Sequence, residues 1–222
     1  MTTNPKIQNN FKRIILFSSL NGGTGKSFIA KLCAIEFAKK NKVGLIDIDI
    51  NSLGLTNQLN LFGKKIESKT DSHGNTLVFP INCYEFKFIS AGLLDIGSVL
   101  TGVRSGMLSS ISRLLINDVC WGEIDYLFID TPSGLSDIEL TLLDDFPNID
   151  IIFISNGNMF ADNRKLQYYL NRKVNIAGLL YNKQNSIIDL EQEYITFCKN
   201  LNISFLGSFI NAEIEETIFY FK

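Results

Sequence analysis

The sequence contains few of the residues on which many kinds of functional site depend. Its one histidine, His73, lies in a polar stretch at residues 71–75. A Ser-His-Asp or Cys-His catalytic set therefore has no histidine in a suitable place. No two cysteines form a C-x-x-C pair or show zinc-finger spacing with the histidine; they stand at Cys33, Cys83, Cys120 and Cys198. We interpret them as buried thiols in a reducing compartment.

Long apolar runs and a strong net charge are also missing. No run reaches the ~18 residues of a membrane span, and the polar N-terminal segment MTTNPKIQNN lacks the apolar core of a signal peptide. The net charge of -2 offers no general attraction to nucleic acid or an anionic membrane. Short basic clusters at residues 39–42, 64–65 and 164–165 are typical of solvated faces. We predict a cytoplasmic protein whose partners are neither membranes nor nucleic acid.

What the sequence does contain is an alternation of short apolar runs with longer amphipathic stretches. This pattern is typical of βαβ units around a parallel sheet. Helices are expected at residues 27–40 and 107–116, and a hairpin or irregular excursion at residues 63–80. The predicted strands are residues 14–18, 43–48, 86–90, 126–129, 149–155, 177–181 and 203–207. We predict one three-layer α/β domain over residues 1–222, with a mainly parallel sheet and a flexible N-terminal arm at residues 1–12.

A glycine-rich loop joins the first predicted strand to the first predicted helix. The stretch from Leu20 to Ser27 reads LNGGTGKS, which departs from the pattern G-x-x-x-x-G-K-[ST] only in having Leu20 at the first glycine. Such glycines turn backbone N–H groups inward around a phosphate, and the following helix N-terminus adds partial positive charge. Lys26 is expected to reach the β- and γ-phosphates, and the Ser27 hydroxyl to bind Mg²⁺.

Carboxylates follow two of the other predicted strands. Asp47 and Asp49 lie in the run LIDIDI at the carboxyl end of the second predicted strand, and Asp130 ends YLFID and is followed by Thr-Pro-Ser-Gly. Ligands of open α/β sheets bind at the carboxyl ends of the strands. A carboxylate there can hold Mg²⁺ or its water molecules, and another can orient an attacking water.

These motifs resemble those of the MinD/ParA/Mrp group of P-loop ATPases, whose deviant Walker A loop is K-G-G-x-G-K-[ST]. The similarity is greatest to the Mrp-type ATPases, which are linked to iron–sulfur cluster assembly. It covers residues 13–214 and is most specific in residues 121–134, WGEIDYLFIDTPSG, where the family pattern is close to W-G-x-L-D-Y-L-x-I-D-x-P-P-G. Residues 43–50 and 178–182 are also similar. The resemblance implies a MinD-like (SIMIBI) P-loop fold.

The resemblance also implies residue roles. The nucleotide-binding set would comprise Asn21, Gly22, Gly23, Thr24, Gly25, Lys26, Ser27, Phe28 and Asn182, with Asn182 as the amide that reads adenine. Ser27, Asp47 and Asp130 would serve the metal, Asp49 would position the hydrolytic water, and Lys26 would act beside it in catalysis. A strand-closing turn residue is the alternative interpretation of Asn182.

Three departures from the family pattern matter. Asn21 stands where the family has the lysine that reaches across a nucleotide-bound dimer, and a missing cationic finger can cost ~10³–10⁵ in rate. We interpret Arg104 as a solvated loop residue rather than its substitute. The Mrp-type C-x-x-C expected after Asn182 is absent, which argues against a bound iron–sulfur cluster. Ser133 replaces the second proline of the Asp130 motif, which is a mild change.

We therefore predict a Mg²⁺-dependent ATP-binding protein with weak ATPase activity, whose ATP state is a homodimer that serves an unknown protein client. Three alternatives remain open: an iron–sulfur scaffold or carrier of the Mrp type, an ATP-binding adaptor without turnover, and a ParA-like positioning ATPase.

Overall fold

The chain folds around one central sheet. The computed structural model describes residues 9–49, 54–70, 72, 74, 76–93, 107–183 and 189–210, so Arg104 and His73 lie outside it. Along the chain the elements are β1 (Asn10–Ser18), α1 (Lys26–Ala38), β2 (Val43–Asp47), α2 (Gly54–Gln58), β3 (Glu67–Thr70), β4 (Thr76–Phe79), β5 (Ile81–Cys83), β6 (Phe86–Ser90), η1 (Ala91–Leu93), α4 (Met107–Arg113), η2 (Leu114–Asp118), β7 (Glu123–Asp130), α5 (Asp137–Asp145), β8 (Ile149–Ser155), α6 (Met159–Asn171), β9 (Asn175–Asn182), α7 (Glu191–Leu201) and β10 (Phe205–Phe209).

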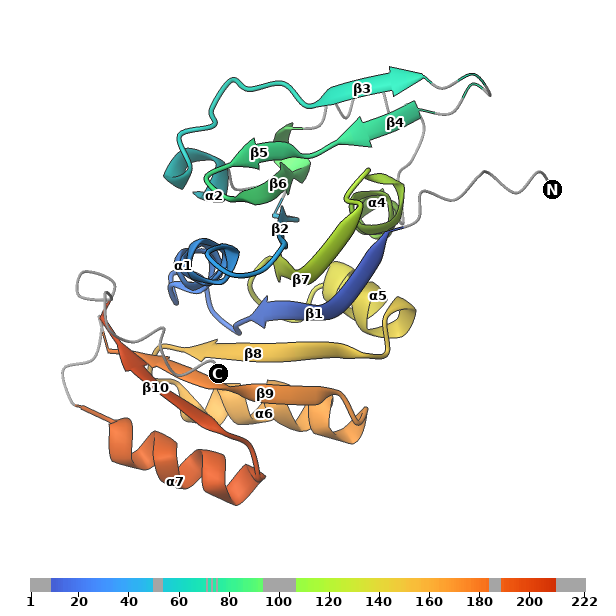
Figure 1. Cartoon of the computed structure of the whole chain (residues 1–222). Coiled ribbons are helices and arrows are strands. Elements are labelled where there is room, and N and C mark those ends of the chain that lie inside the picture. Colours follow the sequence, from blue (N-terminus) through green and yellow to red (C-terminus); the bar gives the residue numbers. More distant parts are fainter. Residues whose placement is uncertain are drawn as a thin grey trace.

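The sheet is mainly parallel, as predicted. Its strand order is β10-β9-β8-β1-β7-β2-β6-β5, and within it only β5 runs antiparallel to its neighbour. The glycine loop follows β1, and the loop after Asp130 follows β7. Both loops therefore begin near the centre of the sheet, because β1 lies between β8 and β7 (Figure 1). A separate hairpin of β3 and β4 occupies part of the region where we expected a hairpin or irregular excursion.

Helices cover both faces of the sheet, which confirms the three-layer prediction (Figure 1). On one face α4, α5, α6 and α7 bury side chains such as Ile111, Leu142, Leu166 and Tyr194. On the other face α1 and α2 bury Ile29, Cys33 and Leu55 among others. Burial on both faces explains why strands such as β2, VGLID, are buried throughout.

Several strands begin earlier in the structure than the sequence predicts. β1 begins at Asn10, so residues 10–12, which we assigned to a flexible arm, belong to the strand and pair along β7. β7 likewise begins at Glu123 rather than at residue 126. These extensions alternate polar with apolar side chains at the end of the sheet, so they do not form the continuous apolar runs on which the strand predictions rest. The short elements α2 and β5 were missed for want of a clear period.

Gly44 in β2 provides the first prediction. A Cβ atom at Gly44 would stand 2.9 Å from Leu127 Cδ1 and 2.9 Å from Trp121 Cζ3, and both of these side chains are fully buried. Gly44→Ala is therefore expected to destabilise the fold by about 1–3 kcal/mol, the usual cost of overpacking a core. Urea denaturation measures this cost, and an unchanged unfolding midpoint would contradict the packing described here.

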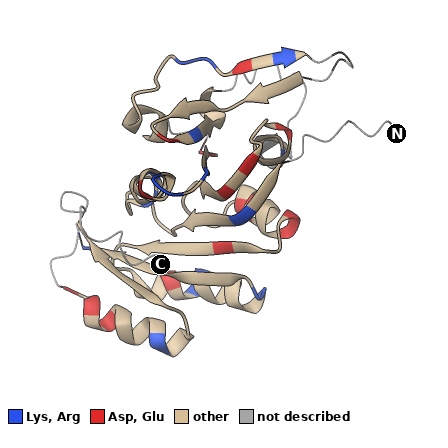
Figure 2. Ribbon diagram, in the orientation of Figure 1, with Lys and Arg blue, Asp and Glu red and all other residues tan. Residues whose placement is uncertain are grey.

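No helix among the described residues combines the length and the apolar character that crossing a membrane requires. Lys and Arg positions are interspersed with Asp and Glu positions over much of the described chain (Figure 2). Arg13 pairs with Asp150 and Arg113 with Asp145, for example.

Candidate functional site

The glycine loop lies between β1 and α1, as predicted. Gly23 and Gly25 have positive φ angles of 71° and 87°, a conformation that side chains with a Cβ rarely adopt. Gly25 caps α1 without a side-chain hydrogen bond, and the first turn of α1 holds no acidic residue. The N–H groups of this turn therefore present partial positive charge to the loop, and no acidic side chain of the turn itself neutralises it.

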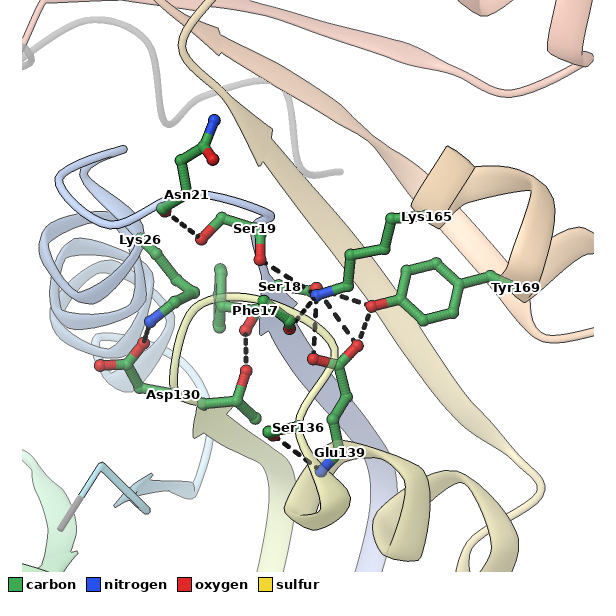
Figure 3. Close-up of polar contacts among 12 residues, drawn as sticks. Phe17, Ser18, Ser19, Asn21, Lys26, Asp130, Ser136, Glu139, Lys165 and Tyr169 are labelled. Atoms are coloured by element: carbon green, nitrogen blue, oxygen red, sulfur yellow. Dashed lines mark hydrogen bonds and ion pairs between the residues drawn. The ribbon is translucent and has the colours of Figure 1, made fainter. Parts of the chain in front are cut away.

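Lys26 and Asp130 form a buried ion pair beside this loop (Figure 3). Their Nζ and Oδ1 atoms are 2.8 Å apart, and the two side chains are 9% and 2% exposed. Sequence reasoning placed both residues in the site but did not foresee that they pair with each other. A bound phosphate would compete with Asp130 for the Lys26 ammonium.

Asp47 lies directly beside Asp130 in the sheet. The two residues are register partners at the ends of the parallel strands β2 and β7. Burial, reinforced by the Asp130 carboxylate, raises the pKa of Asp47 to about 8, although Asp47 accepts hydrogen bonds from the Asp49 amide and the Ser90 hydroxyl. Two carboxyl groups held together in this way form a site that a divalent cation would favour. Asp49 follows β2 and is half-buried.

Thr24 has an orphaned hydroxyl in the loop. Its side-chain oxygen is buried and, in the part of the chain that the structure describes, has no hydrogen-bond partner. Buried polar groups almost always have partners, so an orphan at the entrance to α1 fits a loop built to receive a polar ligand. Ser27, three residues further on, is half-buried.

Asn182 closes β9 and lies against the loop. Its side-chain amide donates a 2.9 Å hydrogen bond to the Thr24 carbonyl, and the residue is 1% exposed. Asn182 thus joins the end of β9 to the glycine loop, 158 residues earlier in the chain. Asn182 is the last residue of β9 itself, not a turn residue after it as the alternative interpretation had it.

Two predicted members lie apart from the central ion pair. The Asn21 side chain points away from Lys26 and Asp130 (Figure 3), while its carbonyl accepts a 3.0 Å hydrogen bond from the Ser19 hydroxyl. The Phe28 ring is covered by Lys31, whose Nζ lies 5.2 Å from the ring centroid. Gly22 faces the loop after Asp130, since a Cβ added there would lie 3.9 Å from Ser133 Oγ.

Sequence reasoning missed Lys165, a buried residue whose side chain donates to the carbonyl of Ser19 next to the glycine loop. We grouped it with Arg164 in a solvated basic cluster, but the Lys165 side chain is 1% exposed and pairs with Glu139 at 3.0 Å. The helical period of α6 predicts that Lys165 is buried, because Lys165 shares the helix face that carries Asp162, Leu166 and Tyr169. A charged residue on an apolar helix face indicates a buried polar network.

A second buried network surrounds Asp162. Its carboxylate accepts hydrogen bonds from the hydroxyls of Ser155 and Tyr194, and the Tyr194 oxygen accepts a 3.1 Å hydrogen bond from the Gly157 amide. Burial raises the pKa of Asp162 to about 6. The network fixes the segment between β8 and α6 against α7.

The Asp162 shift gives a signed pH prediction. The folded state keeps a proton that the unfolded chain loses near pH 3.8, so the contribution of Asp162 to stability falls as pH rises from about 4 to about 6. The stability of Asp162→Asn relative to the unsubstituted protein should rise over this window by at most about 3 kcal/mol. Urea unfolding at several pH values measures the difference, and a pH-independent difference would contradict the assignment.

Among the described residues, the four cysteines do not form a set that could hold an iron–sulfur cluster. Cys33, Cys83 and Cys198 are buried, and Cys120 is half-buried. Burial raises the pKa of all four thiols, to about 12 for Cys33 and Cys198, whereas a cluster needs thiolates. Within the described ranges no three His, Cys, Asp or Glu side chains gather closely enough to hold a metal ion.

Known proteins match this chain along most of its described length. The ParA profile, described as NUBPL iron-transfer P-loop NTPase, matches residues 10–211. An iron–sulfur cluster carrier protein from Synechocystis is 30% identical over 210 residues, covering 88% of this chain and 59% of the relative. A probable cytosolic Fe-S cluster assembly factor from Schizosaccharomyces japonicus is 28% identical over 211 residues, covering 89% and 31%. The chain thus spans less than two thirds of these relatives.

Solved structures show the same fold. A nucleotide-binding protein from Archaeoglobus fulgidus in complex with ADP superposes with a TM-score of 0.72 at 20% identity, covering 94% of this chain and 84% of that one. The septum site-determining protein MinD from Pyrococcus horikoshii, complexed with Mg-ADP, gives a TM-score of 0.66 at 18% identity, covering 94% and 85%.

Proposed function

This chain belongs to the ParA family of P-loop NTPases, of the NUBPL iron-transfer type, and from that premise we propose that it binds ATP with Mg²⁺ as a switch in iron–sulfur cluster assembly. The observation that carries the proposal is the convergence of Lys26, Asp130 and Asp47 beside the N-terminus of α1, where the N-cap Gly25 provides no side-chain hydrogen bond. Cationic, acidic and backbone N–H groups at one sheet edge form the set that a magnesium–triphosphate needs.

The residues divide the work by chemistry. The loop amides and Lys26 would hold the phosphates, Ser27 with Asp47 and Asp130 would hold Mg²⁺, and Asp49 would orient the hydrolytic water. Asn182 would recognise the base, because one amide offers both a donor and an acceptor. Bound ATP supplies the phosphoryl group, and the metal neutralises its charge.

Binding would rearrange the ion pair at the centre of the site. A triphosphate would offer Lys26 a stronger set of acceptors than Asp130 does, so Asp130 would become available to hold the metal. The switch therefore begins with the exchange of the Lys26 partner. Asn21 supplies no charge in trans, so we expect slow turnover until a partner completes the site.

Titration calorimetry tests the proposal. Mg–ATP and Mg–ADP are added to the full chain, with GTP as the comparison nucleotide. We expect saturable binding of both adenine nucleotides and weaker binding of GTP. The absence of heat with any nucleotide, confirmed by equilibrium dialysis, would contradict the proposal.

The names of the curated relatives favour a second candidate, a carrier of the cluster itself, more than a general ATP switch. The cluster would then be cargo. Because the described thiols are protonated and dispersed, we expect this chain alone to retain little cluster after incubation with iron and sulfide under anaerobic conditions. A stable visible absorption band that disappears in Cys120→Ser or Cys198→Ser would favour the carrier.

A further inference from the structure

The Lys165 ammonium is fully used inside the protein. Its Nζ donates to the Ser19 carbonyl at 3.0 Å, to the Gly134 carbonyl at 2.6 Å and to Glu139 Oε2 at 3.0 Å (Figure 3). An ammonium has three N–H donors, so each of them has an acceptor. Lys165 therefore joins helix α6 to three other parts of the chain, which are the loop after β1, the loop after β7 and helix α5.

The Glu139 carboxylate, which pairs with Lys165, also has further hydrogen-bond partners. Glu139 is fully buried and accepts hydrogen bonds from Tyr169 and, at 3.4 Å, from Ser18. Burial lowers the pKa of Lys165 and raises that of Glu139. A buried ion pair is costly, and apolar side chains of similar volume commonly replace one without loss of stability. The pair is thus better explained by what it connects than by the stability it adds.

Two of the segments that Lys165 joins to helix α6 are the loops of the proposed nucleotide site. Ser19 opens the glycine loop directly after β1, and Gly134 lies in the loop after Asp130. These two loops also bond directly, since the Gly134 amide donates to the Ser19 carbonyl at 3.0 Å. The Ser19 oxygen therefore accepts from both Gly134 and Lys165, and a movement of either loop must disturb the same ammonium.

Helix α6 carries this junction to the molecular surface. Lys165 lies in the second turn of the helix, and Phe160 in its first turn is 81% exposed. Leu135, which follows Gly134, is 43% exposed. The two elements that Lys165 joins thus both display apolar side chains.

We propose that Lys165 is a positioning residue that couples the loop after Asp130 to helix α6, so that nucleotide binding at Lys26 changes the helix as well as the loop. The proposal rests on the proposed function, because the signal is the exchange of the Lys26–Asp130 pair. Lys165 itself lies outside the phosphate-binding set.

The double variant Lys165→Met with Glu139→Gln tests the junction without leaving a lone buried charge. Both replacements keep the approximate volume, and circular dichroism checks that the variant folds. In the nucleotide-free protein, amide hydrogen exchange in residues 131–136 should accelerate about tenfold or more, while that of β9 stays unchanged. The matched control is Arg164→Met, which removes an exposed charge from the adjacent position. Equal exchange in the double variant and the unsubstituted protein would overturn the proposal.

The coupling itself is read with a non-hydrolysable Mg–ATP analogue. In the unsubstituted protein we expect the analogue to change exchange in both residues 131–136 and α6. In the double variant only the loop should respond, and the Kd of the analogue should stay within about threefold of the original value. The single variant Lys165→Arg, which keeps Glu139, should show the helix response of the unsubstituted protein. A full helix response in the double variant would overturn the coupling. Absence of nucleotide binding by the unsubstituted protein would instead defeat the proposed function.

Discussion

Lys26→Ala is expected to weaken ATP binding at least about 100-fold, because hydrogen bonds from a charged group to phosphate contribute about 1.5–3 kcal/mol each and Lys26 would make more than one. The variant also leaves the buried Asp130 carboxylate without its cation, which opposes the approach of phosphate further. Calorimetric titration with Mg–ATP measures the loss.

The control for Lys26→Ala is Lys40→Ala. Lys40 follows the same helix and is exposed, so the substitution removes an equal charge without touching the loop. ATP affinity should then stay within about twofold of the original value. If Lys26→Ala folds and binds ATP as tightly as this control does, the glycine loop is not the phosphate site.

Asp49→Asn is expected to separate binding from hydrolysis. An amide at this position keeps the shape of the side chain but cannot take up a proton or orient water as a carboxylate does. Phosphate release should therefore fall about 100-fold or more, within the usual range for a lost general base, while ATP affinity changes less than about threefold. A coupled phosphate-release assay and calorimetry provide the two readings.

The exposed Asp144, which pairs with Arg172 on the surface, is the matched control for Asp49. Asp144→Asn should leave both readings unchanged. Equal turnover in Asp49→Asn and the unsubstituted protein would remove Asp49 from its proposed role, whatever happens at Lys26.

Local sequence was enough to find the loop and the strand-end carboxylates. Gly23, Gly25 and Lys26 are adjacent in the chain, and Asp47 and Asp130 each close an apolar strand, so that parallel pairing alone brings them to one edge. The family resemblance added Asn182, which the structure places against Thr24. Which partner Lys26 holds without a nucleotide depends on tertiary distance, and no spacing in the sequence reveals it.

The Lys165–Glu139 junction shows where sequence reasoning reached its limit. Two adjacent cations, Arg164 and Lys165, read as a solvated cluster, but helix geometry sends them to different faces. Glu139 in turn follows the helix cap at Ser136 and could be read simply as a first-turn acid. Only the packing of α5 against α6 and the two loops makes these residues partners.

Nucleotide-dependent sizing of the full chain with Mg²⁺ and ATP, ADP or no nucleotide, with phosphate release followed in the same samples, tests the switch most directly. We predict a dimer with ATP alone and slow release of phosphate. A chain that stays a monomer in every condition, with ATP bound and never hydrolysed, would contradict the switch and leave an ATP-binding adaptor in its place.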